Sequence, residues 1–156
     1  MKRALFTGTF DPFTVGHESI VNRALAFMDE IVVSVIERNV HKETLFSVER
    51  RVDMIRQVYA DNPRVKVISY GGLTVDFAKE QKAEFIIRGV RSLKDFEYEK
   101  EMADMNKRLS GIETILLLTE PDLACVSSSA VRELWAFGKD VTAFLPKGIK
   151  LDRNEK

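Results

Sequence analysis

The chain has 156 residues, of which 45% are apolar and 31% are charged, and these values are ordinary for a folded globular protein. Its 24 basic and 24 acidic residues cancel to a formal net charge of zero, which argues against a general nucleic-acid-binding protein. One cysteine and two histidines exclude an internal disulfide and offer little for a metal site built by the protein alone. We find no pattern of a signal peptide or a membrane span, so we expect a cytoplasmic protein without a membrane partner.

Apolar runs rich in β-branched residues alternate with segments of helical period along the chain. Strands are predicted over 4–6, 31–36, 65–68, 85–87 and 114–118. Helices are predicted directly after His17, from an N-cap at Ser47 to Tyr59, over 75–82, over a long segment that includes 98–109, and over 127–135. Strands separated by helices predict right-handed crossovers, so the expected fold is α/β: a doubly wound, parallel, five-stranded sheet with helices on both faces. We expect one domain over 1–156, in which 146–156 form a short C-terminal tail.

A polar, turn-rich segment follows each predicted strand, and these segments are 7–17, 39–42, 71–74, 88–91 and 123–129. Ligands of parallel α/β sheets bind outside the carboxyl ends of the strands, so we expect the five segments to converge on one crevice. The first segment suits a phosphate, because Gly8 and Gly16 allow close approach of the backbone and His17 can donate a hydrogen bond near a helix start. We therefore predict a nucleotide site there.

Several of these segments carry recognisable motifs. Thr14-Val15-Gly16-His17 resembles the T/H-x-G-H signature of the nucleotidylyltransferase superfamily, and Val126-Ser127-Ser128-Ser129 with Arg132 resembles its second motif. Within that superfamily the chain is most similar to the bacterial phosphopantetheine adenylyltransferase family, through Gly8-Thr9-Phe10-Asp11-Pro12, Arg88-Gly89-Val90-Arg91, Asp95-Phe96-Glu97-Tyr98-Glu99, Met105-Asn106 and the segment 140–146. The similarity covers nearly the whole chain, which identifies it as one nucleotidylyltransferase domain, and departs from the family pattern at Val40, Thr44 and Gly72.

This resemblance implies a Rossmann-like fold, a homohexamer, and transfer of the adenylyl group from Mg-ATP to 4′-phosphopantetheine, which gives dephospho-coenzyme A and pyrophosphate. The transfer needs no enzyme nucleophile, because a phosphate oxygen of the acceptor attacks the α-phosphorus of ATP in line. The catalytic residues that it implies are His17, Thr9, Lys42, Arg88 and Arg91. No carboxylate cluster suits a metal cage, so we expect Mg²⁺ to arrive on the triphosphate of ATP and no protein residue to be its dedicated ligand.

The expected roles divide between the two substrates. His17 donates to the α- or β-phosphate as charge builds there, and Lys42 and Arg88 hold the phosphate of the acceptor. The residues expected to bind ATP are Thr9, Phe10, His17, Gly89, Val90, Arg91, Glu99, Leu123, Ala124, Cys125, Val126, Ser127, Ser128 and Ser129. The residues expected to bind 4′-phosphopantetheine are Thr9, Lys42, Leu73, Thr74 and Arg88.

Other interpretations stay open at this point. Ser127 can be an ordinary helix N-cap, and Arg91 can pair with Asp95 four residues on. Glu99 can orient an arginine instead of binding the ribose. A sister enzyme could use nicotinamide mononucleotide, or CTP with a polyol phosphate, but the segment 88–99 together with Lys42 favours phosphopantetheine. A nucleotide-binding module without catalysis would be expected to lack His17 or the serine motif, and both are present. A nucleic-acid partner is the weakest hypothesis, because the net charge is zero.

Overall fold

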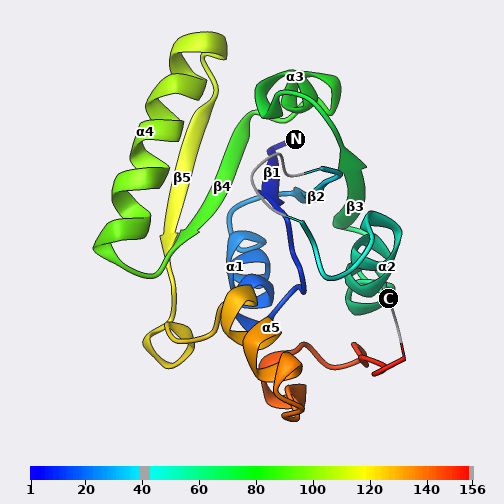
Figure 1. Cartoon of the computed structure of the whole chain (residues 1–156). Helices are drawn as coiled ribbons and strands as arrows, with labels where there is room; N and C mark the ends of the chain where they lie inside the picture. The colour runs from blue at the N-terminus through cyan, green and yellow to red at the C-terminus, as the bar shows by residue number, and fades with distance from the viewer. Residues whose placement is uncertain (39–42, 155–156) are drawn as a thin grey trace.

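The fold is a five-stranded parallel sheet in the order β3-β2-β1-β4-β5, seen in a computed structural model that describes residues 1–38 and 43–154 (Figure 1). The strands are β1 (Arg3–Gly8), β2 (Glu30–Ile36), β3 (Val65–Tyr70), β4 (Phe85–Val90) and β5 (Glu113–Leu118). Every neighbouring pair is parallel, and the strand order reverses between β1 and β4. The predicted doubly wound, Rossmann-like α/β fold is therefore confirmed.

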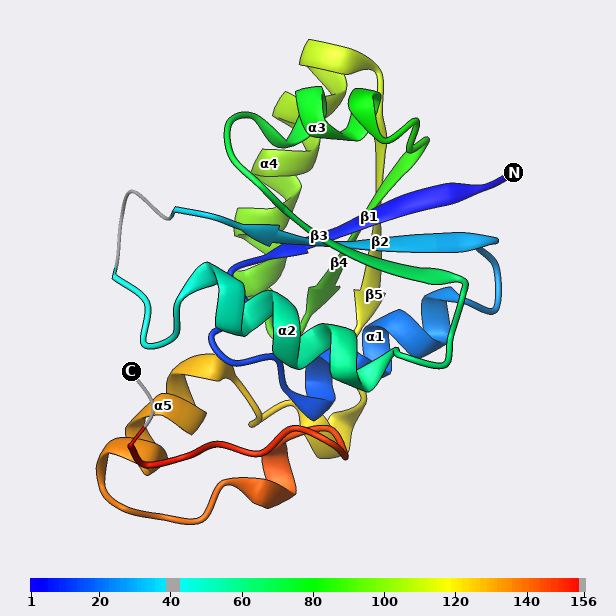
Figure 2. The same ribbon diagram turned by 90° about the vertical axis from the view of Figure 1, so that its right-hand side faces the viewer.

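Helices cover both faces of the sheet. They are α1 (Val15–Ala24), α2 (Val48–Val58), α3 (Thr74–Glu80), α4 (Leu93–Ser110) and α5 (Ser128–Ala136), with short 3₁₀ turns η1 (Pro121–Leu123) and η2 (Thr142–Phe144). Figure 2 shows β1 and β2 nearly edge-on, with α3 above them and α1, α2 and α5 below, and α4 runs beside β5 and contacts α3. Among the described residues, no helix is long and apolar enough to cross a membrane.

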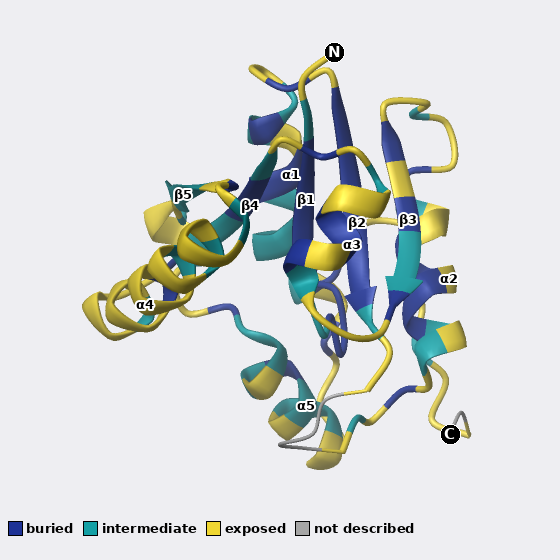
Figure 3. Ribbon diagram, turned by 90° about the horizontal axis from the view of Figure 1, so that it is seen from above, coloured by how far each residue is buried: buried dark blue, intermediate teal, exposed yellow. Residues whose placement is uncertain are grey.

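The alternation of side chains along β1 divides the core between the two faces. Ala4 and Phe6 belong to the large apolar cluster that α1, α2 and α5 cover, whereas Leu5 belongs to a smaller cluster that includes Phe77 and Ala78 of α3. Both faces of β1 and β2 are buried, as Figure 3 shows. A strand buried on both faces needs a nearly continuous apolar sequence, which explains why these strands could be predicted.

Helix α4 carries its apolar residues on the outside. Tyr98, Met102, Met105 and Leu109, which keep helical spacing, are 59%, 37%, 57% and 57% exposed. The one residue of the helix that is buried is Glu99. In Figure 3 this helix is mostly exposed along its length. The stripe on α4, defined by those four apolar residues, therefore contributes nothing to the core of a single chain.

Most element boundaries differ from the prediction by a few residues, and two of these differences involve predicted site residues. Helix α1 starts at Val15, before His17, because Thr14 caps it and the His17 side chain completes the cap. Strand β4 runs on to Val90, so Arg88 lies inside the strand and not after it. There the backbone stays in register with β5, with Arg88 opposite Leu116, and a ladder of backbone hydrogen bonds does not depend on side-chain polarity.

The chain after Pro146 lies against α2 and α5. Ile149 is buried in the large cluster, and Arg50 of α2 donates to the carbonyl of Lys150 at 2.9 Å. Farther on, the Arg153 guanidinium lies 3.5 Å from the centre of the Trp135 ring and donates to the carbonyls of Trp135 and Lys139.

Candidate active site

An open pocket of about 360 Å³ lies at the carboxyl ends of β1, β4 and β5, where the strand order reverses. Its walls come from the turn after β1, the start of α1, the end of β4, the first turns of α4 and the start of α5. The residues that line it are Phe6, Thr7, Gly8, Thr9, Phe10, Asp11, Thr14, Gly16, His17, Ile20, Arg88, Gly89, Arg91, Asp95, Tyr98, Glu99, Thr119, Val126, Ser127, Ser128, Ser129 and Arg132. Three of the five predicted segments thus meet in one cavity.

The ring of His17 is held in one orientation by a capping box and by aromatic neighbours. The backbone N–H of Thr14 donates to Nδ1 of His17 at 2.9 Å, and Thr14 Oγ1 accepts from the His17 backbone N–H. The Phe13 ring stacks on the imidazole with centroids 5.3 Å apart, and the Phe10 ring meets it edge-on at 5.0 Å. Because Nδ1 accepts a hydrogen bond, we infer that the proton of the neutral ring is on Nε2.

The surroundings keep His17 neutral. Burial and the positive charges of Arg88 and Arg91 lower the pKa of His17 from 6.5 to about 3. The imidazole is therefore a neutral hydrogen-bond donor at physiological pH, and it carries no charge of its own toward an anion.

Arg88 is gripped by the buried acid of α4. Its Nε and one terminal nitrogen donate to the two carboxylate oxygens of Glu99, each at 2.7 Å. The other terminal nitrogen donates to the carbonyl and hydroxyl oxygens of Thr7. Burial opposes the charge of Arg88, but the hydrogen bonds and the charge of Glu99 outweigh it, so the pKa of Arg88 is raised. The pair fixes a cation on the floor of the pocket, in the two-point geometry that guanidinium and carboxylate favour.

Arg91 stands at the entrance, before the first turn of α4. Its Nε and its backbone N–H both donate to Asp95 Oδ2, at 3.2 and 3.1 Å. The predicted pair of Arg91 with Asp95 is thus observed. The pair engages Arg91 through Nε, which is compatible with its terminal amino groups contacting an anion.

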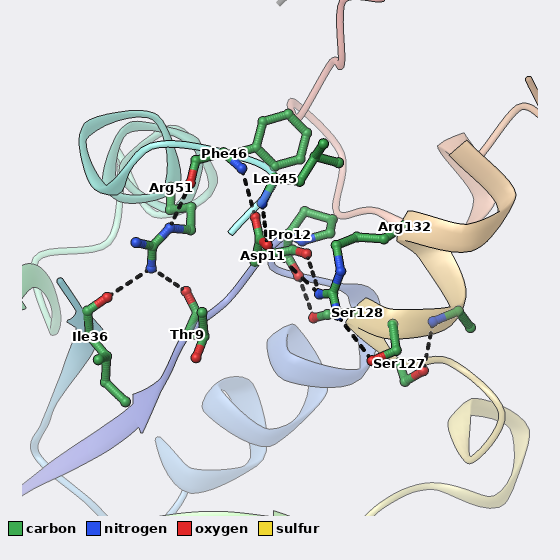
Figure 4. Close-up of polar contacts among 12 residues, drawn as sticks. Thr9, Asp11, Pro12, Ile36, Leu45, Phe46, Arg51, Ser127, Ser128 and Arg132 are labelled. Atoms are coloured by element: carbon green, nitrogen blue, oxygen red, sulfur yellow. Dashed lines mark hydrogen bonds and ion pairs between the residues drawn. The ribbon is translucent and has the colours of Figure 1, made fainter. Parts of the chain in front are cut away.

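The start of α5 is tied to the turn after β1 (Figure 4). Ser127 is the N-cap and accepts from the Ala130 backbone N–H at 3.0 Å, as one of the two interpretations predicted. Ser128 Oγ donates to the carbonyl of Pro12 at 2.7 Å, and Arg132 donates to the carbonyl of Asp11 at 2.8 Å. The amino end of this helix, which favours anions, therefore borders the pocket at a fixed distance from the first turn.

Comparisons of the sequence with known proteins identify its relatives. A model of the family described as cytidylyltransferase-like matches residues 5–134. A phosphopantetheine adenylyltransferase of Phocaeicola vulgatus is 59% identical over 97% of this chain and 100% of the relative. Its counterpart of Bacteroides thetaiotaomicron is 57% identical over the same shares, and that of Flavobacterium johnsoniae is 44% identical over 98% of this chain and 100% of the relative.

The chain belongs to the phosphopantetheine adenylyltransferase family. The recognition made from the T-x-G-H, Arg-Gly-Val-Arg and serine motifs is therefore confirmed. The roles of individual residues in this family member stay predictions, and the structure adds where each of them lies.

Most of the predicted site residues line the pocket. Those that do are Thr9, Phe10, His17, Arg88, Gly89, Arg91, Glu99, Val126, Ser127, Ser128 and Ser129. Thr74 lines a second, small cavity of about 20 Å³ between α3 and α4, which it shares with Arg88 and Glu99. Leu73 is 62% exposed beside it. Val90 and Cys125 are neighbours of lining residues in the chain but do not line the pocket themselves, and Leu123 and Ala124 do not line it either. Lys42 lies outside the described residues.

The sequence reasoning missed a buried arginine beside the site. Arg51 is 1% exposed and lies on the apolar side of α2, at helical spacing between Val48 and Ile55. A cation inside an apolar stripe is the signal that could have found it, because such a residue needs buried partners. Those partners include the Thr9 carbonyl in the first turn.

Proposed function

We propose that this chain transfers the adenylyl group of ATP to 4′-phosphopantetheine, giving dephospho-coenzyme A and pyrophosphate. Relatives that carry the name phosphopantetheine adenylyltransferase at 59% and 57% identity support this activity. The main support from the structure is that one pocket contains a neutral hydrogen-bond donor, His17, two cations, Arg88 and Arg91, and the amino end of α5.

The chemistry is a direct displacement without a covalent enzyme intermediate. A phosphate oxygen of the acceptor forms a bond to the α-phosphorus while the bond from that phosphorus to the bridging oxygen breaks, and pyrophosphate leaves with the electron pair. Negative charge grows on the oxygens around the phosphorus. A neutral Nε2–H of His17, already oriented by Thr14, Phe10 and Phe13, donates to that charge without any reorganisation.

The remaining residues bind the attacking phosphate of the acceptor and the leaving pyrophosphate. Arg88, oriented by Glu99, binds the phosphate of the acceptor together with Lys42, and Thr9 lies in the turn between acceptor and nucleotide. Arg91 and the amino end of α5 hold the β- and γ-phosphates that leave as pyrophosphate. Most of the rate enhancement then comes from positioning and from charge stabilisation.

A divalent metal, which we propose to be Mg²⁺, belongs to the nucleotide substrate. Within residues 1–38 and 43–154, no three His, Cys, Asp or Glu side chains gather in a way that could hold a metal ion. The donor set of the pocket instead consists of arginines, hydroxyls and backbone N–H groups, which suit phosphate oxygens. Bound to the triphosphate, the ion would neutralise charge on the leaving group.

The decisive experiment measures pyrophosphate release with Mg-ATP and one acceptor at a time. We expect release with 4′-phosphopantetheine and none with nicotinamide mononucleotide. Because the family model is described as cytidylyltransferase-like, the same assay is run with CTP in place of ATP. Release only with nicotinamide mononucleotide, or only with CTP, would overturn the proposed substrates.

We also propose a homohexamer in the cytoplasm. The exposed stripe on α4 supports self-association, since apolar residues at helical spacing on an otherwise charged helix suit a partner surface. The number six comes from the family resemblance. Light scattering should give six times the chain mass of 17.8 kDa, Met105→Glu should lower it, and the control Lys94→Gln should not. A monomer at micromolar concentration would refute the proposal, and cell fractionation tests the location.

A further inference from the structure

A buried arginine outside the pocket joins three backbone segments next to it. The side chain of Arg51 donates to the carbonyls of Thr9 at 2.7 Å, Ile36 at 2.9 Å, Phe46 at 3.1 Å and Glu37 at 3.3 Å (Figure 4 shows the first three). All four acceptors are backbone oxygens. One guanidinium therefore fixes the turn after β1, the end of β2 and the residue before the α2 N-cap with respect to one another.

Asp11 reinforces the same junction from the other side. It is 2% exposed, and its two carboxylate oxygens accept from the backbone N–H groups of Leu45 at 2.7 Å and Phe46 at 2.9 Å. The Arg132 side chain lies 3.8 Å from the same carboxylate. The Phe46 peptide is thus held at its N–H by Asp11 and at its carbonyl by Arg51.

The place of these contacts in the chain gives them a function. Thr9 lies in the pocket turn, beside His17. By binding the carbonyls of Glu37, Phe46 and Thr9 together, Arg51 fixes the residues after β2 and before the α2 N-cap against the turn that lines the pocket.

A purely structural role is a poor explanation for this arrangement. An apolar side chain of similar volume would fill the space without the cost of desolvating a charge, and such replacements are often neutral or stabilising. The rigid guanidinium instead supplies directional bonds to several segments at once, which an apolar side chain cannot do.

We propose that Arg51 and Asp11 are positioning residues that set the distance between the acceptor's phosphate and the α-phosphorus of ATP. This inference rests on the proposed adenylyl transfer. Arg51 acts through the turn that contains Thr9, the residue predicted to bind both substrates, and it touches neither substrate. In reactions that depend on near-attack geometry, a displacement of about 1 Å costs about 10²-fold in rate.

The test compares Arg51→Lys with Arg56→Lys. Lysine keeps the charge but has a single nitrogen, so it cannot bridge four carbonyls. Arg56 is the matched control, because it lies on the same helix and donates to a backbone carbonyl, that of Val67, at 3.0 and 3.2 Å. For each protein we measure kcat, KM for both substrates, ATP affinity by calorimetry and Tm.

We expect Arg51→Lys to lower kcat about 10- to 100-fold and to raise KM for phosphopantetheine, while ATP affinity changes less than about threefold. Arg56→Lys should leave all three within about twofold of wild type. A lower Tm in Arg51→Lys with unchanged kcat and KM would show a merely structural residue and would reject the inference. No pyrophosphate release by the wild type would instead reject the proposed function and this inference with it.

Asp11→Asn decides the question if Arg51→Lys does not fold. The amide keeps one acceptor oxygen and turns an N–H₂ group toward the second backbone N–H, so one of the two bonds to Leu45 and Phe46 is lost. The same fall in kcat and rise in KM for phosphopantetheine supports the inference. Kinetic constants equal to those of the wild type would overturn it.

Discussion

We expect His17→Ala to lower kcat for pyrophosphate release about 10²- to 10³-fold, while the Kd for ATP changes less than about threefold. The substitution removes a single oriented donor, Nε2–H, and leaves the cations of the pocket in place. A donor that acts mainly on charge developed in the transition state contributes to turnover more than to binding of the ground state.

The magnitude follows from the state of the ring. Nδ1 of His17 accepts from the Thr14 N–H, so Nε2 carries the one proton that the neutral ring can offer. With a pKa of about 3, about one ring in 10⁴ is protonated at pH 7, and the donor strength does not change across the physiological range. Loss of one preorganised donor corresponds to about 3–4 kcal/mol of transition-state stabilisation.

The assay follows pyrophosphate release over a range of substrate concentrations between pH 5 and pH 8. The phosphates of the substrates titrate at about pH 6, so the wild type is compared with His17→Ala at each pH. The ratio of their kcat/KM values should not change near 6.5, the ordinary pKa of histidine, because His17 of the free protein stays neutral throughout. Thr14→Val serves as the control. It removes the capping hydroxyl but keeps the imidazole, so it measures what loss of the cap alone does to kcat.

Two results would refute this reasoning. A kcat of His17→Ala within a few-fold of the wild type would mean that the ring stabilises no developing charge. A wild-type kcat/KM that changes through pH 6.5, in a way that His17→Ala abolishes, would mean that the histidine titrates in the working range and that its neutrality is misassigned.

Three further outcomes follow from the same region. Glu99→Gln should raise KM for phosphopantetheine and lower the free energy of unfolding in urea by about 2 kcal/mol, because the amide removes the negative charge and one of the two oxygens that accept from Arg88. Unchanged values of both quantities would contradict the role of this pair. Gly8→Ala should destabilise the fold by about 1–3 kcal/mol, since a Cβ there would lie 2.9 Å from the ring of Phe10, and an unchanged denaturation midpoint would show that the ring yields freely. Between pH 6.5 and about 3 the unfolded chain binds a proton at His17 that the folded chain does not. Wild-type stability should therefore fall with decreasing pH by about 1.4 kcal/mol per unit more than that of His17→Ala, as urea titrations at several pH values can measure.

Those parts of the fold that depend on local pattern could be predicted from the sequence. The β-branched run of β2 and the serine cap of α2 lie where they were expected, because burial on both faces and capping each leave a local signature. Contacts between residues that are far apart in the chain have no local sequence pattern from which they could be predicted. The extension of β4 through Arg88 depends on a neighbouring strand more than twenty residues away in the chain.

The candidate site shows the same division. Family motifs brought His17, Arg91 and the serine run to one pocket, and the structure agrees. The apolar spacing of α4 suggests a core helix, yet its stripe faces outward, because helical spacing shows which residues share one face of the helix and not what covers that face. The role of Arg51 depends on four backbone oxygens from three segments, and no spacing along the sequence encodes their meeting.

The stacking of Arg153 on Trp135 makes the chain suited to optical study. Trp135 is the one tryptophan among the 156 residues, so its fluorescence reports a single environment. A guanidinium 3.5 Å from the ring centre is a strong local perturbation of the indole, and it is present when the end of the chain lies on α5. Emission during denaturation therefore follows release of the C-terminal segment, while circular dichroism follows the sheet and helices. Comparing the two midpoints shows whether the segment leaves before the domain unfolds or together with it.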